Sequence, residues 1–375
     1  MTIEEIRDQF PFLHTGRVYL DHAAASPYSV FVEQSMQRYI TACTHGSLDT
    51  YSDTLRVIGE TRSMVAEMLV CDASRIAFTL NTSEGLNILA AGLQWRHGDH
   101  IVVVDQEFPA NIYPFLNLRR HGVDVSFAPQ RNGEVRVEDI ERAMTPRTRL
   151  VAVSWVQFLS GYVIDLAALK NVCDKRGALL CVDAIQGIGA IRLNLAETPV
   201  DFIAAGVQKW QMAPQGVGIV FLSERVQDMV QQSTLGWLSV KDAWNFFDYN
   251  TALPDDARRY ESGTYNAIGI HGYHAALEFF RRVGHDRVDE LVRANAEHAW
   301  KLAAELGLEL VTPEQTRNRA GIVTFRHEHA DAIREKLWRR RITLSARIGH
   351  IRISAHFYNT KEELERMFDE FNNIR

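Results

Sequence analysis

A lysine and an aspartate at the ends of two apolar segments are the residues of this chain best suited to chemistry. Lys209 follows the apolar and small residues 203–207 and precedes a turn rich in proline and glycine. A lysine withdrawn from water has a lowered pKa, so its neutral amine can attack an aldehyde and form a Schiff base. Asp183 ends the apolar run 178–182, which is typical of a buried strand. A buried carboxylate there can hold a protonated ring nitrogen.

These two side chains match the needs of pyridoxal 5′-phosphate (PLP), a cofactor that takes a lysine on its aldehyde and an acid on its pyridine nitrogen. Each residue also has a simpler interpretation. Most lysines are solvated surface charges, and Asp183 could cap the helix that follows it. We therefore ask whether other segments supply the remaining contacts of such a cofactor.

Thr82 and Ser83 lie in residues 81–87, which join an expected strand to an expected helix. A helix N-terminus with small hydroxyl residues suits a phosphate, although the same residues are common helix caps. Phe108 follows another strand and could stack on a flat ring, although a phenylalanine beside a proline is more often part of the core. Gln186 lies three residues beyond Asp183, where it could reach a cofactor oxygen or remain an exposed polar residue.

The elements that position these residues alternate along the first two thirds of the chain. Strands separated by helices imply βαβ crossovers and a mostly parallel sheet that is buried on both faces. Ligands of such sheets bind beyond the carboxyl ends of the strands, where all the residues named above lie. The apolar runs predict strands at 75–80, 100–105, 123–128, 150–154, 179–183, 202–205 and 218–222, with helices at 84–95, 111–121 and 167–176.

The pattern changes after residue 256. A long helical stretch, 269–305, is followed by short strands at 321–325 and 350–354 and by an amphipathic helix at 360–373. Thr360 and Glu363 have the spacing of a capping box at the start of that helix. We therefore expect an N-terminal segment 1–20, a large domain 21–255 and a small C-terminal domain 256–375.

Composition narrows the class of protein. The 375 residues carry a formal net charge of −6, and no basic run is present, so nucleic acid is not an expected partner. No stretch of about 18 apolar residues predicts a membrane span, and residues 1–10 lack the apolar core of a secretion signal. The four cysteines have no metal-ligand spacing, so we expect a cytoplasmic protein with reduced thiols and no metal site.

Taken in order, the motifs resemble the class V aminotransferase family, in the group related to cysteine desulfurases, isopenicillin N epimerase and kynureninase. The resemblance covers nearly the whole chain, and six weak motifs occur in the order typical of the family. They are residues 19–27 (YLDHAAASP), 82–84 (TSE), 183–186 (DAIQ), 208–210 (QKW), 261–266 (ESGTYN) and 352–359 (RISAHFYN).

The resemblance implies a PLP enzyme of fold-type I, with a large seven-stranded α/β domain and a smaller α+β C-terminal domain. It implies that Lys209 and Asp183 are the catalytic pair and that Arg352 binds the substrate carboxylate, for which a guanidinium is well shaped. Thr264 would reach the phosphate of a neighbouring subunit, so we expect a homodimer. The other implied cofactor contacts are Thr82, Ser83, Phe108, Gln186 and Gln208, and the expected substrate contacts besides Arg352 are His22, Ala23, Ala24 and Gln157.

The sequence also departs from the desulfurase pattern. Related enzymes often carry a histidine where this chain has Phe108, and another where it has Gln208. Desulfurases need a nucleophilic cysteine shortly before the carboxylate-binding arginine, and residues 341–352 contain none. A persulfide mechanism would therefore require Cys43, on the N-terminal segment, to approach the site.

We therefore expect an enzyme that acts on an amino acid or amine, first as an aminotransferase. A C–S, C–C or C–N lyase or an epimerase is the alternative, because these reactions share their first steps. Cysteine desulfuration ranks below them, and a protein that binds without catalysis ranks last. Arg347, five residues before Arg352, could accept a second carboxylate of the substrate.

Overall fold

The computed structural model describes residues 1–46 and 48–375. Its strands are β1 (Val18–Tyr19), β2 (Ile76–Thr79), β3 (His100–Val104), β4 (Asp124–Ala128), β5 (Gln130–Arg131), β6 (Glu134–Val135), β7 (Thr148–Ser154), β8 (Leu179–Asp183), β9 (Phe202–Gly206), β10 (Gly218–Leu222), β11 (Ile322–Arg326), β12 (Ile342–Thr343), β13 (Ser345–Arg347) and β14 (His350–Ser354). Its α-helices are α1 (Ile3–Arg7), α2 (Val30–His45), α3 (Tyr51–Leu69), α4 (Thr82–Gly92), α5 (Tyr113–Leu116), α6 (Val137–Ala143), α7 (Leu166–Arg176), α8 (Glu224–Met229), α9 (Ala267–Val283), α10 (His285–Glu305), α11 (Ala330–Arg339) and α12 (Lys361–Asn372).

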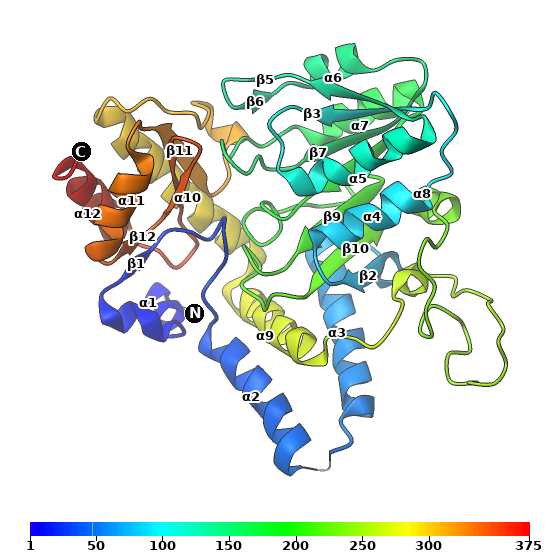
Figure 1. Cartoon of the computed structure of the whole chain (residues 1–375). Coiled ribbons are helices and arrows are strands. Elements are labelled where there is room, and N and C mark those ends of the chain that lie inside the picture. The colour runs from blue at the N-terminus through cyan, green and yellow to red at the C-terminus, as the bar shows by residue number, and fades with distance from the viewer. Residues whose placement is uncertain (47) are drawn as a thin grey trace.

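A seven-stranded sheet with the order β2-β10-β9-β8-β7-β3-β4 forms the centre of the large domain (Figure 1). Only β10 runs antiparallel to its neighbours, so the expected mostly parallel α/β sheet is confirmed. Every residue of β3, β8, β9 and β10 is buried, because helices cover both faces. The carboxyl ends of β2, β3, β7, β8 and β9 therefore meet at one edge of the sheet.

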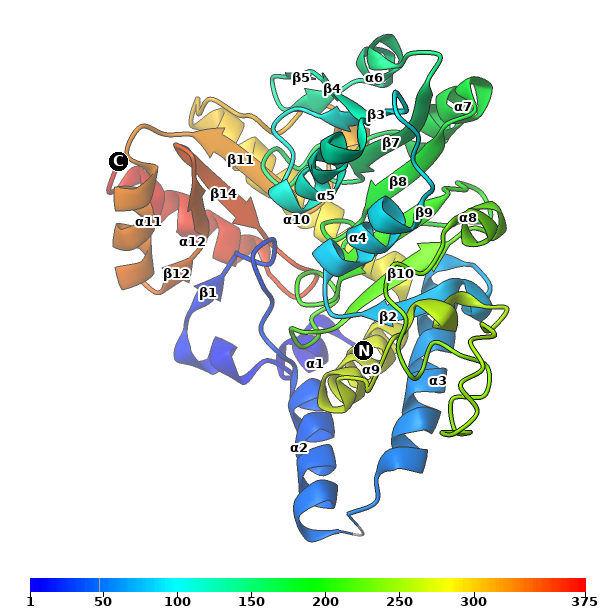
Figure 2. The same ribbon diagram turned by 45° about the vertical axis from the view of Figure 1, so that its right-hand side comes forward.

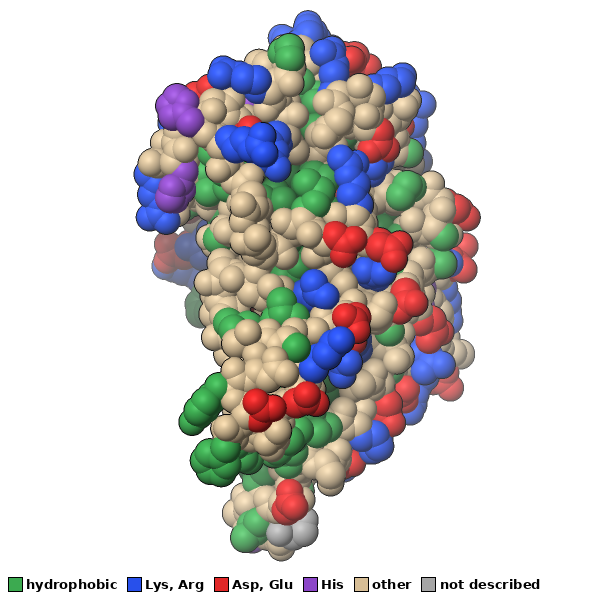
Figure 3. Space-filling model, turned by 90° about the vertical axis from the view of Figure 1, so that its right-hand side faces the viewer, with side chains coloured by type: hydrophobic (Ala, Val, Ile, Leu, Met, Phe, Trp, Pro, Cys, Tyr) green, Lys and Arg blue, Asp and Glu red, His purple; other side chains and the backbone are tan. Residues whose placement is uncertain are grey.

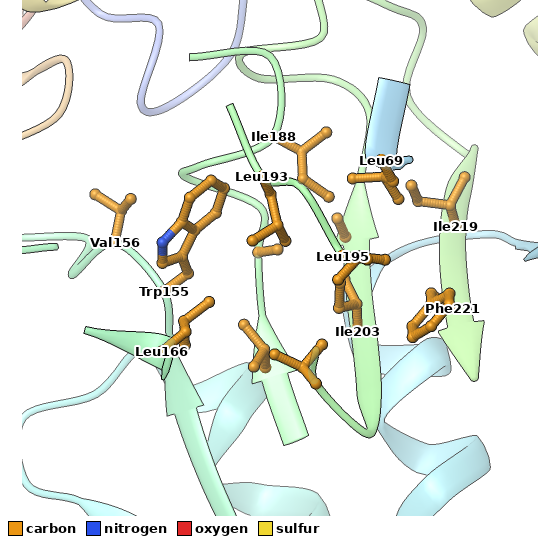
Figure 4. Packing of buried hydrophobic residues seen from close by; sticks show 14 of the residues in the cluster. Leu69, Trp155, Val156, Leu166, Ile188, Leu193, Leu195, Ile203, Ile219 and Phe221 are labelled. Carbon is orange, nitrogen blue, oxygen red and sulfur yellow. The ribbon is translucent and has the colours of Figure 1, made fainter. Parts of the chain in front are cut away.

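Alternate strand residues build the two halves of the core. Ile101 and Val103 of β3 pack with apolar residues of α4, α5 and α8, whereas Val102 and Val104 pack with those of α3, α6, α7 and α9. In the second layer, Trp155 lies close to Leu193 and Ile188 from the segment that follows β8 (Figure 4). This packing fixes the segment on which Gln186 lies, directly after Asp183 at the end of β8.

The C-terminal part carries a three-stranded antiparallel sheet, β11-β14-β13, covered by α10, α11 and α12. β1 pairs in parallel with β12, so the N-terminal residues lie beside this sheet (Figure 2). The predicted capping box of α12 is confirmed, with both reciprocal hydrogen bonds between Thr360 and Glu363. Where the two domains divide stays a prediction, because α9 packs on α2 and α3 of the large domain.

Three predicted helices differ from the structure. The stretch 269–305 is two helices, which separate at Gly284, whose positive φ of 94° ends α9. The predicted helix 111–121 is only the short α5 followed by a 3₁₀ turn that stops at Gly122, another left-handed residue. Helix α4 ends at Gly92, three residues early, because Leu93 is extended and forms a bridge with Val230. The sequence predicts no helix at the positions of α1, α2, α3, α6, α8 and α11.

An exposed aromatic segment lies on the loop between α8 and α9. Trp244, Phe246, Phe247 and Tyr249 are all exposed, Phe247 by 90%. Figure 3 views the side of the molecule that carries this loop and shows charges of both signs interspersed above hydrophobic side chains. Across the described residues, no helix combines the length and apolarity that a membrane crossing requires.

Candidate active site

Lys209 lies just beyond β9, on the edge where the strand ends meet. Its Nζ is 5.5 Å from the ring centroid of Phe108, which follows β3. Burial lowers the pKa of Lys209 to about 8, the negative charge of Asp183 opposes the shift, and the charges of Arg352 and Arg347 reinforce it. The structure thus brings Phe108, Asp183, Arg347 and Arg352 close enough to Lys209 to contact its amine or to shift its pKa.

Asp183 ends β8 and is only 2% exposed. Its Oδ1 accepts one hydrogen bond, 3.0 Å long, from the backbone N–H of Ile185. Burial raises the pKa of Asp183 to about 7, partly opposed by this hydrogen bond, and the charge of Glu107 raises it further. Because burial disfavours a lone carboxylate, Asp183 would bind best to a group that donates a hydrogen bond or carries a positive charge.

Phe108 presents an aromatic face at the same place. Its side chain is 44% exposed, and its ring meets Phe158 edge-on at 5.5 Å between centroids. An exposed ring with a lysine amine above it is a suitable platform for a flat heterocycle.

Thr82 and Ser83 form the first turn of α4, but neither is its cap. The cap is Asn81, whose side chain accepts a 2.9 Å hydrogen bond from the backbone of Glu84. Thr82 is buried, and its hydroxyl accepts a 2.8 Å hydrogen bond from Gly206 of β9, whereas Ser83 is exposed. Gly85 lets the helix approach the sheet, because a Cβ there would lie 2.7 Å from Val220. The first turn is thereby held beside the strand that leads to the lysine.

Gln186 and Gln208 have different surroundings. The Gln186 amide donates to the carbonyl of Ala23 at 3.0 Å and accepts from the indole of Trp210 at 2.8 Å. One amide hydrogen of Gln186 is left for another acceptor. Gln208 is partly exposed next to the lysine, and its carbonyl accepts from Ser26.

Arg352 on β14 is 2% exposed and still has an unused donor. Nη1 donates to the carbonyl of Phe158 at 2.8 Å and Nη2 to Ser345 at 3.2 Å, and Asp21 lies 3.5 Å from Nη2. Its Nε–H is buried without a hydrogen-bond partner among the described residues. A buried guanidinium with an unsatisfied donor is a binding group for an arriving anion.

Two predicted substrate contacts, His22 and Gln157, have hydrogen-bond partners inside the protein. The His22 ring is fully buried, and its nitrogens lie 2.7 Å from the carbonyl of Ser354 and 2.7 Å from the hydroxyl of Tyr358. Gln157 is 1% exposed and donates to Glu107 at 2.6 Å. Their contact with a substrate stays a prediction. Ala23 is also buried, whereas Ala24 is partly exposed, as are Asp21 and Ala25 of the same loop.

Thr264 is exposed on the loop between Tyr260 and α9. That loop is anchored by Glu261, which pairs with Arg62 at 2.8 Å and accepts a 2.7 Å hydrogen bond from the backbone of Phe78. The loop lines a pocket with Leu80 next to the start of α4. No second subunit is present, so the predicted role of Thr264 in a neighbouring site stays a prediction.

One residue of the site was missed by the sequence interpretation. Glu107 is buried beside Phe108 and accepts hydrogen bonds from Ser154 and Gln157. The available signal was the position of Glu107, directly before Phe108 and close to a strand end. An acidic residue that is buried at such a place needs hydrogen-bond or charged partners.

The residues present fit PLP. A buried acid, a lysine amine, an exposed aromatic face and a helix N-terminus converge at one sheet edge, which is the set of groups that this cofactor needs. Among the described residues, no group of three or more histidine, cysteine or acidic side chains is arranged to hold a metal ion.

Comparison with known proteins gives the same result. The family model "Aminotransferase class-V" matches residues 18–367. A probable cysteine desulfurase of Methanothermobacter thermautotrophicus is 30% identical, covering 100% of this chain and 98% of the relative. An uncharacterized aminotransferase, YcbU, of Bacillus subtilis is 27% identical over 98% of this chain and 96% of the relative. The apo structure of cysteine desulfurase from Thermococcus onnurineus NA1 has a TM-score of 0.89 at 25% identity, covering 98% of this chain and 97% of that one. The chain therefore belongs to the class V aminotransferase family of PLP-dependent enzymes.

Proposed function

We propose that this enzyme removes the Cα proton of an α-amino acid and carries out a transamination. The observation that carries the proposal is the position of the Lys209 amine, beside the exposed ring of Phe108 and within the field of both Asp183 and Arg352. When bound, PLP supplies an aldehyde that takes the amino group and a ring that delocalises the charge left at Cα.

Arg352 orients the substrate by its carboxylate. Its unpartnered Nε–H is the donor available for this contact, and a charge-assisted hydrogen bond contributes about 1.5–3 kcal/mol. Asp21 competes for the same guanidinium at 3.5 Å, so substrate binding replaces part of an existing ion pair. Ala24, a partly exposed residue of the adjacent loop, would line the pocket.

Lys209 then acts as the general base at Cα. With a pKa of about 8, its amine is neutral in a useful fraction of molecules near neutral pH, which an ordinary lysine is not. Asp183 keeps a proton on the ring nitrogen, and Phe108 holds the ring plane. The first turn of α4, with Thr82 and Ser83, would bind the phosphate.

Two measurements test the assignment of the cofactor. The purified protein should show visible absorbance of bound PLP, and borohydride reduction should attach the cofactor to Lys209, as peptide mass spectrometry can determine. A protein that stays colourless and unmodified after PLP is added would contradict the proposal. A half-reaction with a panel of amino acids should then produce pyridoxamine 5′-phosphate.

Sulfur removal from cysteine is the second candidate, and it is favoured by the name of the 30% identical relative. None of the four cysteines suits an enzyme-borne persulfide near Lys209. Cys173 and Cys181 are buried in the core with raised thiol pKa values caused by burial, and the thiol of Cys71 is also shifted upward by burial, to a pKa of about 12. Cys43 lies in α2, which projects away from the sheet (Figure 1).

The two candidates separate in one assay with L-cysteine and a thiol reductant. Sulfide and alanine would indicate sulfur removal, whereas pyridoxamine 5′-phosphate without sulfide would indicate transamination. If sulfide is released, the variant Cys43→Ser shows whether that thiol takes part.

A further inference from the structure

Glu107 is a buried carboxylate to which the proposed reaction gives no task. It lies between Gln106, a left-handed residue with φ 59°, and Phe108. Its Oε1 accepts hydrogen bonds from the backbone N–H of Ser154 at 3.0 Å and from Nε2 of Gln157 at 2.6 Å. Its Oε2 accepts from the Ser154 hydroxyl at 2.5 Å. Every one of these partners donates, which suits an ionised carboxylate.

The hydrogen bonds join two strand ends that carry the site. Ser154 is the last residue of β7, and it pairs in register with Asp183 of β8. Glu107 lies directly before Phe108, so one side chain connects the segment of the stacking ring with the strand beside Asp183. Phe108 itself is 44% exposed, so the buried side chain before it is an anchor for this segment.

The charge of Glu107 also acts on Asp183. The charged and titratable groups that act on Asp183 are Glu107 and Lys209, and the buried Cys181 thiol lies two residues away on the same strand. Glu107 raises the pKa of Asp183, whereas Lys209 lowers it. Burial raises the pKa of Glu107 itself, and its hydrogen bonds from Ser154 and Gln157 oppose that shift.

We propose that Glu107 is a positioning residue, which holds Phe108 against the end of β7 and whose negative charge keeps a proton on the Asp183–cofactor pair. The inference rests on the proposed function in one respect, namely that a PLP-type ring stacks on Phe108 beside Asp183. Glu107 would thus be a second buried carboxylate of the site, whose charge affects the cofactor through Asp183.

The decisive variant is Glu107→Gln, which removes the charge and can keep the hydrogen bonds. The amide oxygen still accepts from Ser154 N–H and Gln157, and the amide nitrogen donates to the Ser154 hydroxyl, which can accept. Asp201→Asn is the matched control, because Asp201 is also a buried acid beside β8, bonded to the backbone of Leu180 at its other end. Ser154→Ala breaks one hydrogen bond of the network but keeps the charge.

The probe is pyridoxamine 5′-phosphate, whose amine cannot form a covalent bond with Lys209. Its dissociation constant is measured by calorimetry from pH 5 to 9 for all four proteins, with thermal unfolding as the check on folding. We expect binding by Glu107→Gln to weaken at a midpoint roughly one pH unit below that of the wild type, the usual effect of a nearby charge. Asp201→Asn and Ser154→Ala should keep the wild-type midpoint.

Coincident pH profiles for Glu107→Gln and the wild type would overturn the proposal, since a purely structural glutamate is replaced by glutamine without a shift. A shift of equal size in Ser154→Ala would also overturn it, and this variant tests the inference even if Glu107→Gln is unstable. Failure of the wild type to bind pyridoxamine 5′-phosphate would instead contradict the proposed function.

Discussion

At the scale of single residues, the site depends on two opposed shifts of proton affinity. Burial drives Lys209 toward the neutral amine and Asp183 toward the protonated acid, and each charge restrains the shift of the other. These shifts suit Lys209 to accept a proton as a base and Asp183 to keep a proton between itself and a bound ring nitrogen.

The first prediction concerns Lys209→Ala. Loss of the general base should lower the rate of Cα proton exchange by about 10²–10⁴-fold or more. Hydrogen–deuterium exchange at Cα of a bound amino acid, followed by NMR, measures this step. Lys241→Ala, which removes an exposed lysine paired with Asp255, should leave the rate unchanged. Equal loss in both variants would show that the effect is not specific to the site.

The second prediction concerns pH. Only the neutral amine of Lys209 captures an aldehyde, so the rate at which apoprotein takes up PLP should rise with pH around a midpoint near 8. The positive charge of Arg347 disfavours protonated Lys209, so Arg347→Gln should raise that pKa and move the midpoint upward. Stopped-flow absorbance measures the uptake. Arg326→Gln, an exposed arginine paired with Glu309, is the control that should not shift.

At the scale of elements, β13 and β14 form a hairpin with a two-residue turn, and β14 carries Arg352, the proposed substrate-binding arginine. Ser345 pairs with Arg352 and Arg347 with His350, so their side chains share one face of the hairpin. The other face, with Ala346 and Ile351, packs into the C-terminal core. The hairpin is therefore both a wall of the site and part of the small domain.

The third prediction concerns Arg352→Ala. The variant should bind amino-acid substrate about 10–100-fold more weakly, since a charge-assisted contact of about 1.5–3 kcal/mol is lost, and should bind PLP nearly as well as the wild type. Titration of the holoenzyme with an amino acid and of the apoprotein with PLP separates the two effects. A comparable loss for both ligands would mean that Arg352 supports the cofactor site and not the substrate.

The fourth prediction concerns the turn of this hairpin. Ile348 has φ 48° although it is β-branched, and Gly349 follows with φ 70°. A left-handed conformation costs an ordinary residue about 1–2 kcal/mol, and asparagine before glycine tolerates it best. Ile348→Asn should therefore raise the free energy of unfolding by about 1 kcal/mol. Chemical denaturation measures the change, and Ile348→Val, which stays β-branched, should not stabilise the protein.

At the scale of the whole molecule, the proposed homodimer would give Thr264 a role in a neighbouring subunit's site. Thr264 is exposed on a loop that the buried Arg62–Glu261 pair fixes, so it is held in a defined place where a second chain could meet it. The exposed aromatic residues Trp244, Phe246, Phe247 and Tyr249 lie on the preceding loop.

The fifth prediction tests this contribution by mixing two inactive variants, Lys209→Ala and Thr264→Asp. If Thr264 completes the partner's site, a mixed dimer has one site with both residues intact. Unfolding and refolding the mixture should then restore about a quarter of the wild-type sites, because half of randomly formed dimers are mixed. Analytical ultracentrifugation verifies the dimer. No recovery of activity would place Thr264 in its own subunit's site, and full activity of Thr264→Asp alone would place it outside the site.

The strand pattern and the chemistry-bearing residues could be predicted from the sequence because both depend on local order. The apolar runs that end at Asp183 and before Lys209 predicted two parallel strands, and parallel strands put their carboxyl ends at one edge. The ends of the helices could be predicted less well from the apolar periodicity. Gly284, for example, ends α9 at a position where the helical periodicity of the sequence continues.

Tertiary structure decided which partners the polar side chains near the site have. The sequence predicts His22 and Gln157 as substrate contacts and does not indicate that Glu107 is buried. The fold gives His22 two internal hydrogen-bond partners and turns Gln157 toward Glu107. A side chain's exposure depends on elements hundreds of residues away, such as the approach of Ser354 to His22. The sequence therefore determined the reactive pair and the sheet edge that holds it, whereas long-range packing determined the charges and contacts around that pair.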